Sequence, residues 1–241
     1  MAGEPKSILF QRIGLPRCST GSTGFDHLLG GGLPASSITD VYGSAGTGKT
    51  QFAFQNAVMN CSETLITRKG SPRVIFIDCS NSFRPERILE IAKSRSLDAE
   101  RILSQIFSVR ARDVRQQITT CNQIYSETFA SCKLLIVDDI TANFMTDYKD
   151  DEVALRQSML AIYLRNLSYF AHRRGVPILL TNSSRSRGEN VEGETTGEGI
   201  AQFSLYRIRF IRKDRVRSAE LMQPELNLPS ISFEIRTSGI S

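Results

Sequence analysis

The sequence predicts an α/β fold in which a mostly parallel central sheet is flanked by helices and carries a C-terminal antiparallel extension. Short apolar or β-branched runs alternate with helical patterns through residues 37–180, as in a parallel sheet that is covered on both faces. Two later segments alternate like strands with no helix between them, which favours the antiparallel extension. At 241 residues, the chain is long enough for one such domain.

Local patterns place the elements in order. Residues 1–18 show no clear period and are predicted to form an N-terminal arm, so the core domain is assigned to residues 19–241. Residues 25–29 are expected to form a short helix, which Gly30 and the two glycines after it would end. The predicted strands, in chain order, are Ser37–Tyr42, Val74–Ile77, Ile106–Val109, Leu134–Val137, Val176–Leu180, Leu205–Arg212 and Ser232–Arg236.

Capping and periodicity predict the helices. One covers Gln51–Asn60, directly after a glycine-rich turn, and another begins at Pro85, whose fixed φ suits the first turn of a helix. The longest runs from about Asp151 to Arg173. Its apolar stripe, with the 4-3-4 spacing of one buried face, consists of Leu160, Leu164, Leu167 and Ala171. The stretch 183–199 is rich in Ser, Gly, Glu and Thr and is predicted to be a loop.

The composition excludes several classes of function. Five scattered cysteines without C-x-x-C spacing are expected to be reduced thiols, with neither a zinc site nor a disulfide framework. Two histidines are too few for a histidine-based metal or nucleophile site. No apolar run approaches the roughly 20 residues that cross a bilayer, and the N-terminus lacks a secretory h-region. We therefore expect an intracellular protein with no membrane partner, in the cytoplasm and nucleoid or, in a eukaryote, the nucleus. The net charge of +5 tolerates a polyanionic partner without requiring one.

A phosphate-binding P-loop is the most specific signal. Residues 43–50 read Gly-Ser-Ala-Gly-Thr-Gly-Lys-Thr, between a predicted strand and a predicted helix. In that context, backbone N–H groups and the positive end of a helix dipole converge on one point. Lys49 is expected to reach the β- and γ-phosphates, and the Thr50 hydroxyl to bind Mg²⁺. The residues predicted to hold a nucleoside triphosphate are Gly43, Ser44, Ala45, Gly46, Thr47, Gly48, Lys49 and Thr50.

A second motif, which ends in acidic residues, completes this site. Leu134–Asp139 is an apolar strand that ends in two carboxylates, which is the Walker B pattern. A buried strand would hold Asp138 rigidly at its C-terminal edge, where the carboxylate accepts a hydrogen bond from a Mg²⁺-bound water. Its position about ninety residues after the P-loop supports this role. Thr50 and Asp138 are therefore the predicted metal-site residues.

Further motifs make the chain resemble the RecA/RadA recombinase family. They are the glycine-rich entry at 20–32, Gly48–Gln51, the segment 76–87 that ends in Phe-Arg-Pro-Glu-Arg, and the segments 155–165 and 175–182. The Phe-Arg-Pro-Glu-Arg block is typical of the branch that contains archaeal RadA, its relative RadB and the eukaryotic paralogues. The resemblance covers about residues 18–236 and implies a RecA-like P-loop NTPase core that binds ATP and Mg²⁺. It makes Gln51 and Arg84 candidate neighbours of the base or phosphates, and Gly46 stands where some relatives carry an arginine near adenine.

The chain departs from this family at the catalytic positions. Relatives place a glutamate that orients the attacking water two residues after Asp78, where this chain has Ser80. Ser183 replaces the glutamine that senses the γ-phosphate. Losing a positioned base typically costs roughly 10²–10⁴-fold in rate. We therefore expect slow or absent hydrolysis, unless Asp139 takes over as the base. The candidate catalytic residues are therefore Lys49 and Asp138, with Asp139 as the alternative base.

In this family single-stranded DNA lies against two loops, which correspond to about 144–152 and 183–199 here. Both segments contain many acidic residues, and neither is strongly basic. The DNA contacts that the resemblance implies are Arg185 and Arg187, with Phe144 and Tyr148 as base-stacking groups. Ordinary solvated loops are the alternative. A further basic set, suited to a DNA groove, a neighbouring subunit's nucleotide pocket or a solvated strand face, consists of Arg207, Arg209, Arg212, Lys213, Arg215 and Arg217.

The length before the core bears on function. Full-length RadA proteins carry an N-terminal DNA-binding domain and an assembly linker, whereas only about eighteen residues precede the core here. This favours an accessory, RadB-like paralogue in homologous recombination and DNA repair, which would bind single-stranded DNA, a RadA-type recombinase or itself. A KaiC-like signalling ATPase is an alternative, although the acidic pair of those enzymes is missing near Cys79 and Ser80. A pseudo-ATPase scaffold that binds only recombinase subunits is the other.

Overall fold

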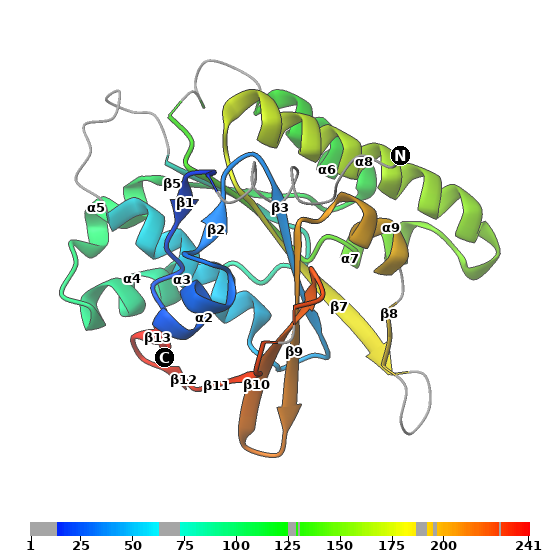
Figure 1. Cartoon of the computed structure of the whole chain (residues 1–241). Coiled ribbons are helices and arrows are strands. Elements are labelled where there is room, and N and C mark those ends of the chain that lie inside the picture. Colours follow the sequence, from blue (N-terminus) through cyan, green and yellow to red (C-terminus); the bar gives the residue numbers. More distant parts are fainter. Residues whose placement is uncertain are drawn as a thin grey trace.

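The computed structural model describes residues 14–62, 73–124, 129, 131–186, 192–194, 197–226 and 228–241. One large sheet runs through this part of the chain, with helices against both of its faces (Figure 1). In spatial order its strands are β11 (Ile231–Phe233), β10 (Val216–Gln223), β9 (Tyr206–Lys213), β3 (Ile38–Gly43), β7 (Ile178–Ser186), β6 (Leu134–Asp138), β4 (Val74–Asp78) and β5 (Ile106–Arg110), with β8 (Glu192–Glu194) paired to the end of β7. Neighbours from β9 to β5 are parallel, whereas β10 and β11 pair antiparallel. This confirms the predicted fold class.

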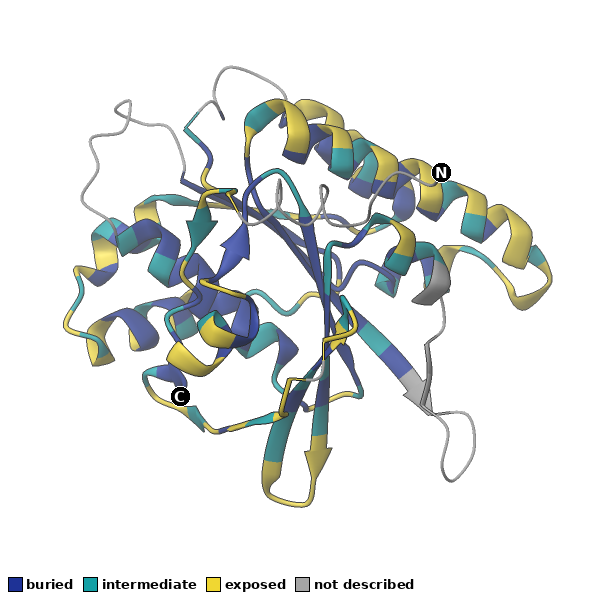
Figure 2. Ribbon diagram, viewed as in Figure 1, coloured by how far each residue is buried: buried dark blue, intermediate teal, exposed yellow. Residues whose placement is uncertain are grey.

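The helices cover the two faces of the sheet, and each face buries one apolar cluster. The first cluster lies beneath α2 (Thr23–Leu28), α3 (Lys49–Ser62), α4 (Pro85–Ser94) and α5 (Ala99–Ser104). The second lies beneath α6 (Val114–Gln123), α7 (Ala142–Asp147), α8 (Val153–Arg174) and α9 (Gly197–Phe203). In β4, Phe76 enters the first cluster and its neighbour Ile77 the second, because successive side chains point to opposite faces. Figure 2 shows the resulting buried sheet.

Two small antiparallel pairs lie outside the main sheet. β1 (Arg17–Cys18) pairs with β2 (Leu33–Pro34), and β12 (Ile235–Arg236) pairs with β13 (Gly239–Ile240). The second pair packs against α3, where the Ile240 N–H donates to Gln55 Oε1 at 2.5 Å. Residues 1–13 are outside the described range, so the division into an arm and a core domain stays a prediction.

The helix predictions with strong local signals are confirmed. The stripe predicted for the long helix lies in α8, where its four side chains are buried, and Gly175 ends the helix with a φ of +66°. Pro85 is the first residue of α4, as its fixed φ predicts. Although α8 has 22 residues, neither it nor any other described helix is long and apolar enough to cross a membrane.

One strand prediction and one loop prediction need correction, and one strand was not predicted. Ile106–Val109 was expected to be covered on both faces, but β5 is an edge strand on which Phe107 is 41% exposed. The predicted loop at 183–199 includes the end of β7, all of β8 and the start of α9. Val216–Gln223 carries no apolar alternation strong enough to predict β10, which forms because β9 and β11 offer it two antiparallel partners. Edge position and pairing depend on neighbours that are distant in sequence.

Four of the five cysteines are buried, which predicts how the thiols react. Burial raises the pKa of Cys61, Cys121 and Cys132 to about 12. Burial, with nearby aspartates, also raises the pKa of Cys79 well above its ordinary value. We expect only the half-buried Cys18 to react with a thiol reagent under native conditions, and the others after unfolding. Mass spectrometry of labelled protein with and without urea tests this, and rapid native labelling of Cys79 would contradict it.

Candidate nucleotide-binding site

The P-loop connects the end of β3 to the start of α3 at the carboxyl edge of the parallel strands. Gly43, with a φ of +155°, has no Cβ and so leaves room for the Phe210 carbonyl oxygen of β9, which a side chain there would strike. Within the loop, the buried Thr47 hydroxyl donates to the Ser44 carbonyl at 2.9 Å. The loop is therefore held by the sheet on one side and by its own hydrogen bond on the other.

Lys49, the first residue of α3, folds back over the loop. Its Nζ donates to the carbonyl oxygens of Gly43 at 2.7 Å and Ser44 at 3.0 Å, and the side chain is buried. The first backbone N–H groups of α3 lack carbonyl partners within the helix, as at any helix N-terminus. A cavity of about 250 Å³ opens here, lined by Gly46, Gly48, Lys49, Thr50, Gln51 and Ile235. Donors and a positive helix end thus face one concave site, which suits an anion.

Asp138, at the end of β6, faces the helix that follows the P-loop. Thr50 Oγ1 donates to the two carboxylate oxygens of Asp138 at 3.1 and 3.2 Å. The hydroxyls of Ser82 and Thr181 also donate to this carboxylate. Burial raises the pKa of Asp138, which is 1% exposed, above its ordinary value, while the hydrogen bonds from Ser82 and Thr181 act in the opposite direction. A bound cation would favour the charged carboxylate.

The residues present fit a magnesium ion. Thr50 and Asp138 bring a hydroxyl and a carboxylate together, and both are oxygen donors of the kind that Mg²⁺ prefers. Thr50 and Asp138 would hold the ion, which would neutralise charge on the β- and γ-phosphates. Lys49 would add a fixed positive charge from the loop itself.

The other two aspartates at this edge have different partners. Asp78 accepts backbone N–H groups from Ser80 at 3.2 Å, Ser82 at 2.9 Å and Phe83 at 3.2 Å, so it shapes the turn after β4. Asp139 Oδ1 accepts from the N–H and Oγ1 of Thr141 at 3.0 and 2.8 Å, and its Oδ2 accepts from the hydroxyl of Ser183. Of the three aspartates, Asp138 is therefore the one that faces Thr50.

Gln51 and Arg84, the two residues predicted to lie near the base or the phosphates, have different surroundings. Gln51 lines the cavity, and its Oε1 accepts from Arg87 Nε at 2.7 Å. Arg84 is exposed, and its guanidinium donates to the carbonyls of Asn81 and Phe83 at 3.1 and 2.8 Å, outside the cavity lining. Sequence reasoning missed Arg87 and Ile235 at this site. Ile235 reaches it from the C-terminal hairpin, which no local motif connects with the P-loop.

The predicted DNA contacts are only partly described. Phe144 was expected to stack on bases, but it is 0% exposed in α7 and packs in the second apolar cluster, so that prediction is wrong. Tyr148 follows α7, half-buried, with its ring stacked 6.4 Å from that of Phe144. Arg185 lies in β7 with its side chain outside the described set, and Arg187 lies outside the described residues. The segment 144–152 is largely helical, because α7 and the 3-10 helix η2 (Asp150–Glu152) occupy it.

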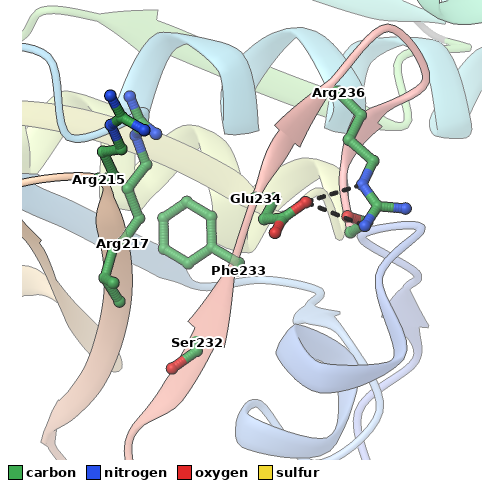
Figure 3. A pocket seen from close by; sticks show the side chains of 8 residues that line it. Arg215, Arg217, Ser232, Phe233, Glu234 and Arg236 are labelled. Atoms are coloured by element: carbon green, nitrogen blue, oxygen red, sulfur yellow. Dashed lines mark hydrogen bonds and ion pairs between the residues drawn. The ribbon is translucent and has the colours of Figure 1, made fainter.

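The basic residues of β9 and β10 divide into two environments. Arg207 is buried and forms an ion pair with Asp40, with Nε 3.0 Å from Oδ2. Arg207 therefore lies neither in a DNA groove nor on a solvated strand face. Arg215 and Arg217 line a groove of about 470 Å³ with Arg236. In Figure 3 the Arg215 and Arg217 side chains run side by side across the groove from Glu234, which pairs with Arg236 at 2.9 Å. We call this the arginine groove.

A family model described as Rad51 matches residues 11–240. The match includes the P-loop, Asp138 and the arginine groove, and it covers nearly all of the 241 residues.

Proposed function

The chain belongs to the Rad51 family, and from this membership we propose that it is an ATP- and Mg²⁺-binding recombinase paralogue of the RadB-like type. The family places it among RecA-family recombinases, which act in recombination and repair. The observation that carries the proposal for this chain is the contact of Thr50 with Asp138 beside the P-loop lysine. These groups lie on separate elements and meet where a Mg²⁺–triphosphate would need them.

Slow hydrolysis is the second part of the proposal. Ser80 is exposed and offers a hydroxyl, which does not accept a proton near neutral pH as a carboxylate does. Asp139, the alternative base, already accepts hydrogen bonds from Thr141 and Ser183. In the proposal Asp139 positions those two side chains, and ATP remains bound long enough to act as a conformational switch. Unchanged turnover in Asp139→Asn would exclude Asp139 as the base.

The proposed partners are single-stranded DNA and a RadA-type recombinase filament or a second copy of the chain. The arginine groove supports a polyanionic partner, because Arg215 and Arg217 present guanidinium groups together on one face. ATP would favour the conformation that binds this partner. A pseudo-ATPase scaffold would instead bind recombinase subunits without regard to nucleotide.

Lys49→Ala is expected to weaken ATP binding more than about tenfold, since it removes a charge-assisted contact with the phosphates. The measurement is fluorescence anisotropy of a labelled single-stranded oligonucleotide at low and moderate salt, with and without ATP and Mg²⁺, next to direct titration with a fluorescent ATP analogue. Wild type should bind the oligonucleotide in a salt-sensitive way and more tightly with ATP, and Lys49→Ala should lose the ATP effect.

Lys93→Ala is the matched control, because Lys93 is an exposed lysine of α4 that lines no part of the cavity. It should behave as wild type in both titrations. Nucleotide binding without any oligonucleotide binding would favour a KaiC-like signalling ATPase. Capture of a recombinase subunit by Lys49→Ala as well as by wild type, with no need for DNA, would favour the scaffold.

A further inference from the structure

The guanidinium group of Arg212 lies next to the P-loop at Gly46. Gly46 has a φ of +76°, and a Cβ built on it would lie 3.2 Å from Nη1 of Arg212. Arg212 belongs to the end of β9, far from the P-loop in sequence. The space beside Gly46 that a side chain would fill is thus occupied by a guanidinium group.

The sheet explains why Arg212 reaches this point. β9 is the parallel neighbour of β3, so both strands end at the edge where the P-loop begins. The close approach of Gly43 to the Phe210 carbonyl fixes the end of β9 against the loop. Arg212 lies two residues after Phe210 and therefore on the same face of the strand. Its Nε donates to the Asp214 carbonyl at 3.1 Å, which anchors the side chain within its own hairpin.

The charge on Arg212 has no acidic partner within the described ranges. No ion pair there joins it to a carboxylate, and its cross-strand neighbour in the β9–β10 register is another cation, Arg217. Two guanidinium groups on adjacent strands repel each other, which is unfavourable unless an anion lies close by. Gly46, which lies beside the Arg212 guanidinium, lines the P-loop cavity, and that cavity suits an anion.

We propose that Arg212 contacts the phosphate chain of bound ATP within the same chain, as a second cation beside Lys49. The inference rests on the proposed function, because it names a further residue of that nucleotide site. A guanidinium presents paired N–H donors that match phosphate oxygens, and it keeps its charge at every physiological pH. Glycine at position 46 leaves the approach open, since any side chain there would meet Arg212.

Arg212→Gln tests this in direct titrations with a fluorescent ATP analogue and Mg²⁺, and in competition by inorganic tripolyphosphate. We expect Arg212→Gln to weaken both by about tenfold, the loss of one charge-assisted contact. Arg212→Lys should recover part of the affinity. Lys213→Gln is the matched control, because it removes the same charge from the next residue of β9, which points to the opposite face. Arg212 is exposed, so thermal melting of the variant should match wild type.

The outcomes distinguish a failure of the inference alone from a failure of the proposed function. Wild-type affinity in Arg212→Gln, with Lys49→Ala impaired, would overturn the role of Arg212 and leave the proposed function standing. An equal loss of affinity in Lys213→Gln would also overturn the role of Arg212. The overall positive charge of the β9–β10 hairpin would then explain the effect. No nucleotide binding by wild type would overturn both. A loss for ATP and tripolyphosphate alike, confined to Arg212 variants, supports the contact.

Discussion

Replacing Arg207 with alanine is expected to lower the free energy of unfolding by about 3–5 kcal/mol. Arg207 pairs with Asp40, which is 0% exposed, and the two residues lie opposite each other in the register of β9 and β3. The guanidinium also lies 4.6 Å from the centroid of the Tyr42 ring. Truncation would leave a buried carboxylate without its cation and remove that packing, which costs much more than losing a surface ion pair.

Urea denaturation followed by circular dichroism measures this change. Arg215→Ala is the matched control, because that arginine is exposed on the same hairpin and should change stability by less than about 1 kcal/mol. The double variant Asp40→Leu with Arg207→Met should recover much of the loss, since an apolar pair leaves no buried charge. Equal stability of Arg207→Ala and Arg215→Ala would show that the buried ion pair contributes little.

Arg207 also shows where sequence reasoning reaches its limit. Period-2 alternation placed it correctly on one face of a strand, opposite Ile208 and Phe210, which are buried in the first cluster. Whether that face meets solvent, DNA or a carboxylate depends on β3, its neighbour in the sheet but distant in sequence. The base-stacking prediction for Phe144 was wrong for the same reason, because Phe144 packs in the second cluster, with its ring 6.2 Å from that of Tyr163 in α8.

The nucleotide site was more predictable, since its information is local. The P-loop occupies consecutive residues between a strand and a helix, so their spacing determines where its backbone points. Asp138 ends an uninterrupted apolar run, and the parallel order of β3, β7 and β6 brings it to the same edge. The contributions of Ile235, Arg87 and Arg212 come from side chains on distant elements. No residue spacing in the sequence could indicate those contacts.

Replacing Ser80 with glutamate is expected to raise ATP hydrolysis by about 10²-fold or more, the contribution of a positioned general base. Asp78 fixes the turn that contains Ser80 through three backbone N–H groups, and Ser82 of the same turn donates to Asp138. A carboxylate at position 80 would thus extend from a rigid turn beside the proposed metal site. Ser80 is exposed, so the longer side chain displaces no core packing.

Phosphate release under saturating ATP and Mg²⁺, with and without single-stranded DNA, measures the rate. Ser80→Gln is the matched control, because glutamine has the length of glutamate and cannot take a proton at neutral pH. A faster Ser80→Glu with Ser80→Gln at the wild-type rate would mean that the site holds ATP correctly and lacks only the base. Since affinity need not change in either variant, the wild-type serine would then prolong the ATP-bound state. Equal rates of ATP hydrolysis in all three proteins would contradict this. The geometry of the bound nucleotide, and not the missing carboxylate, would then limit hydrolysis.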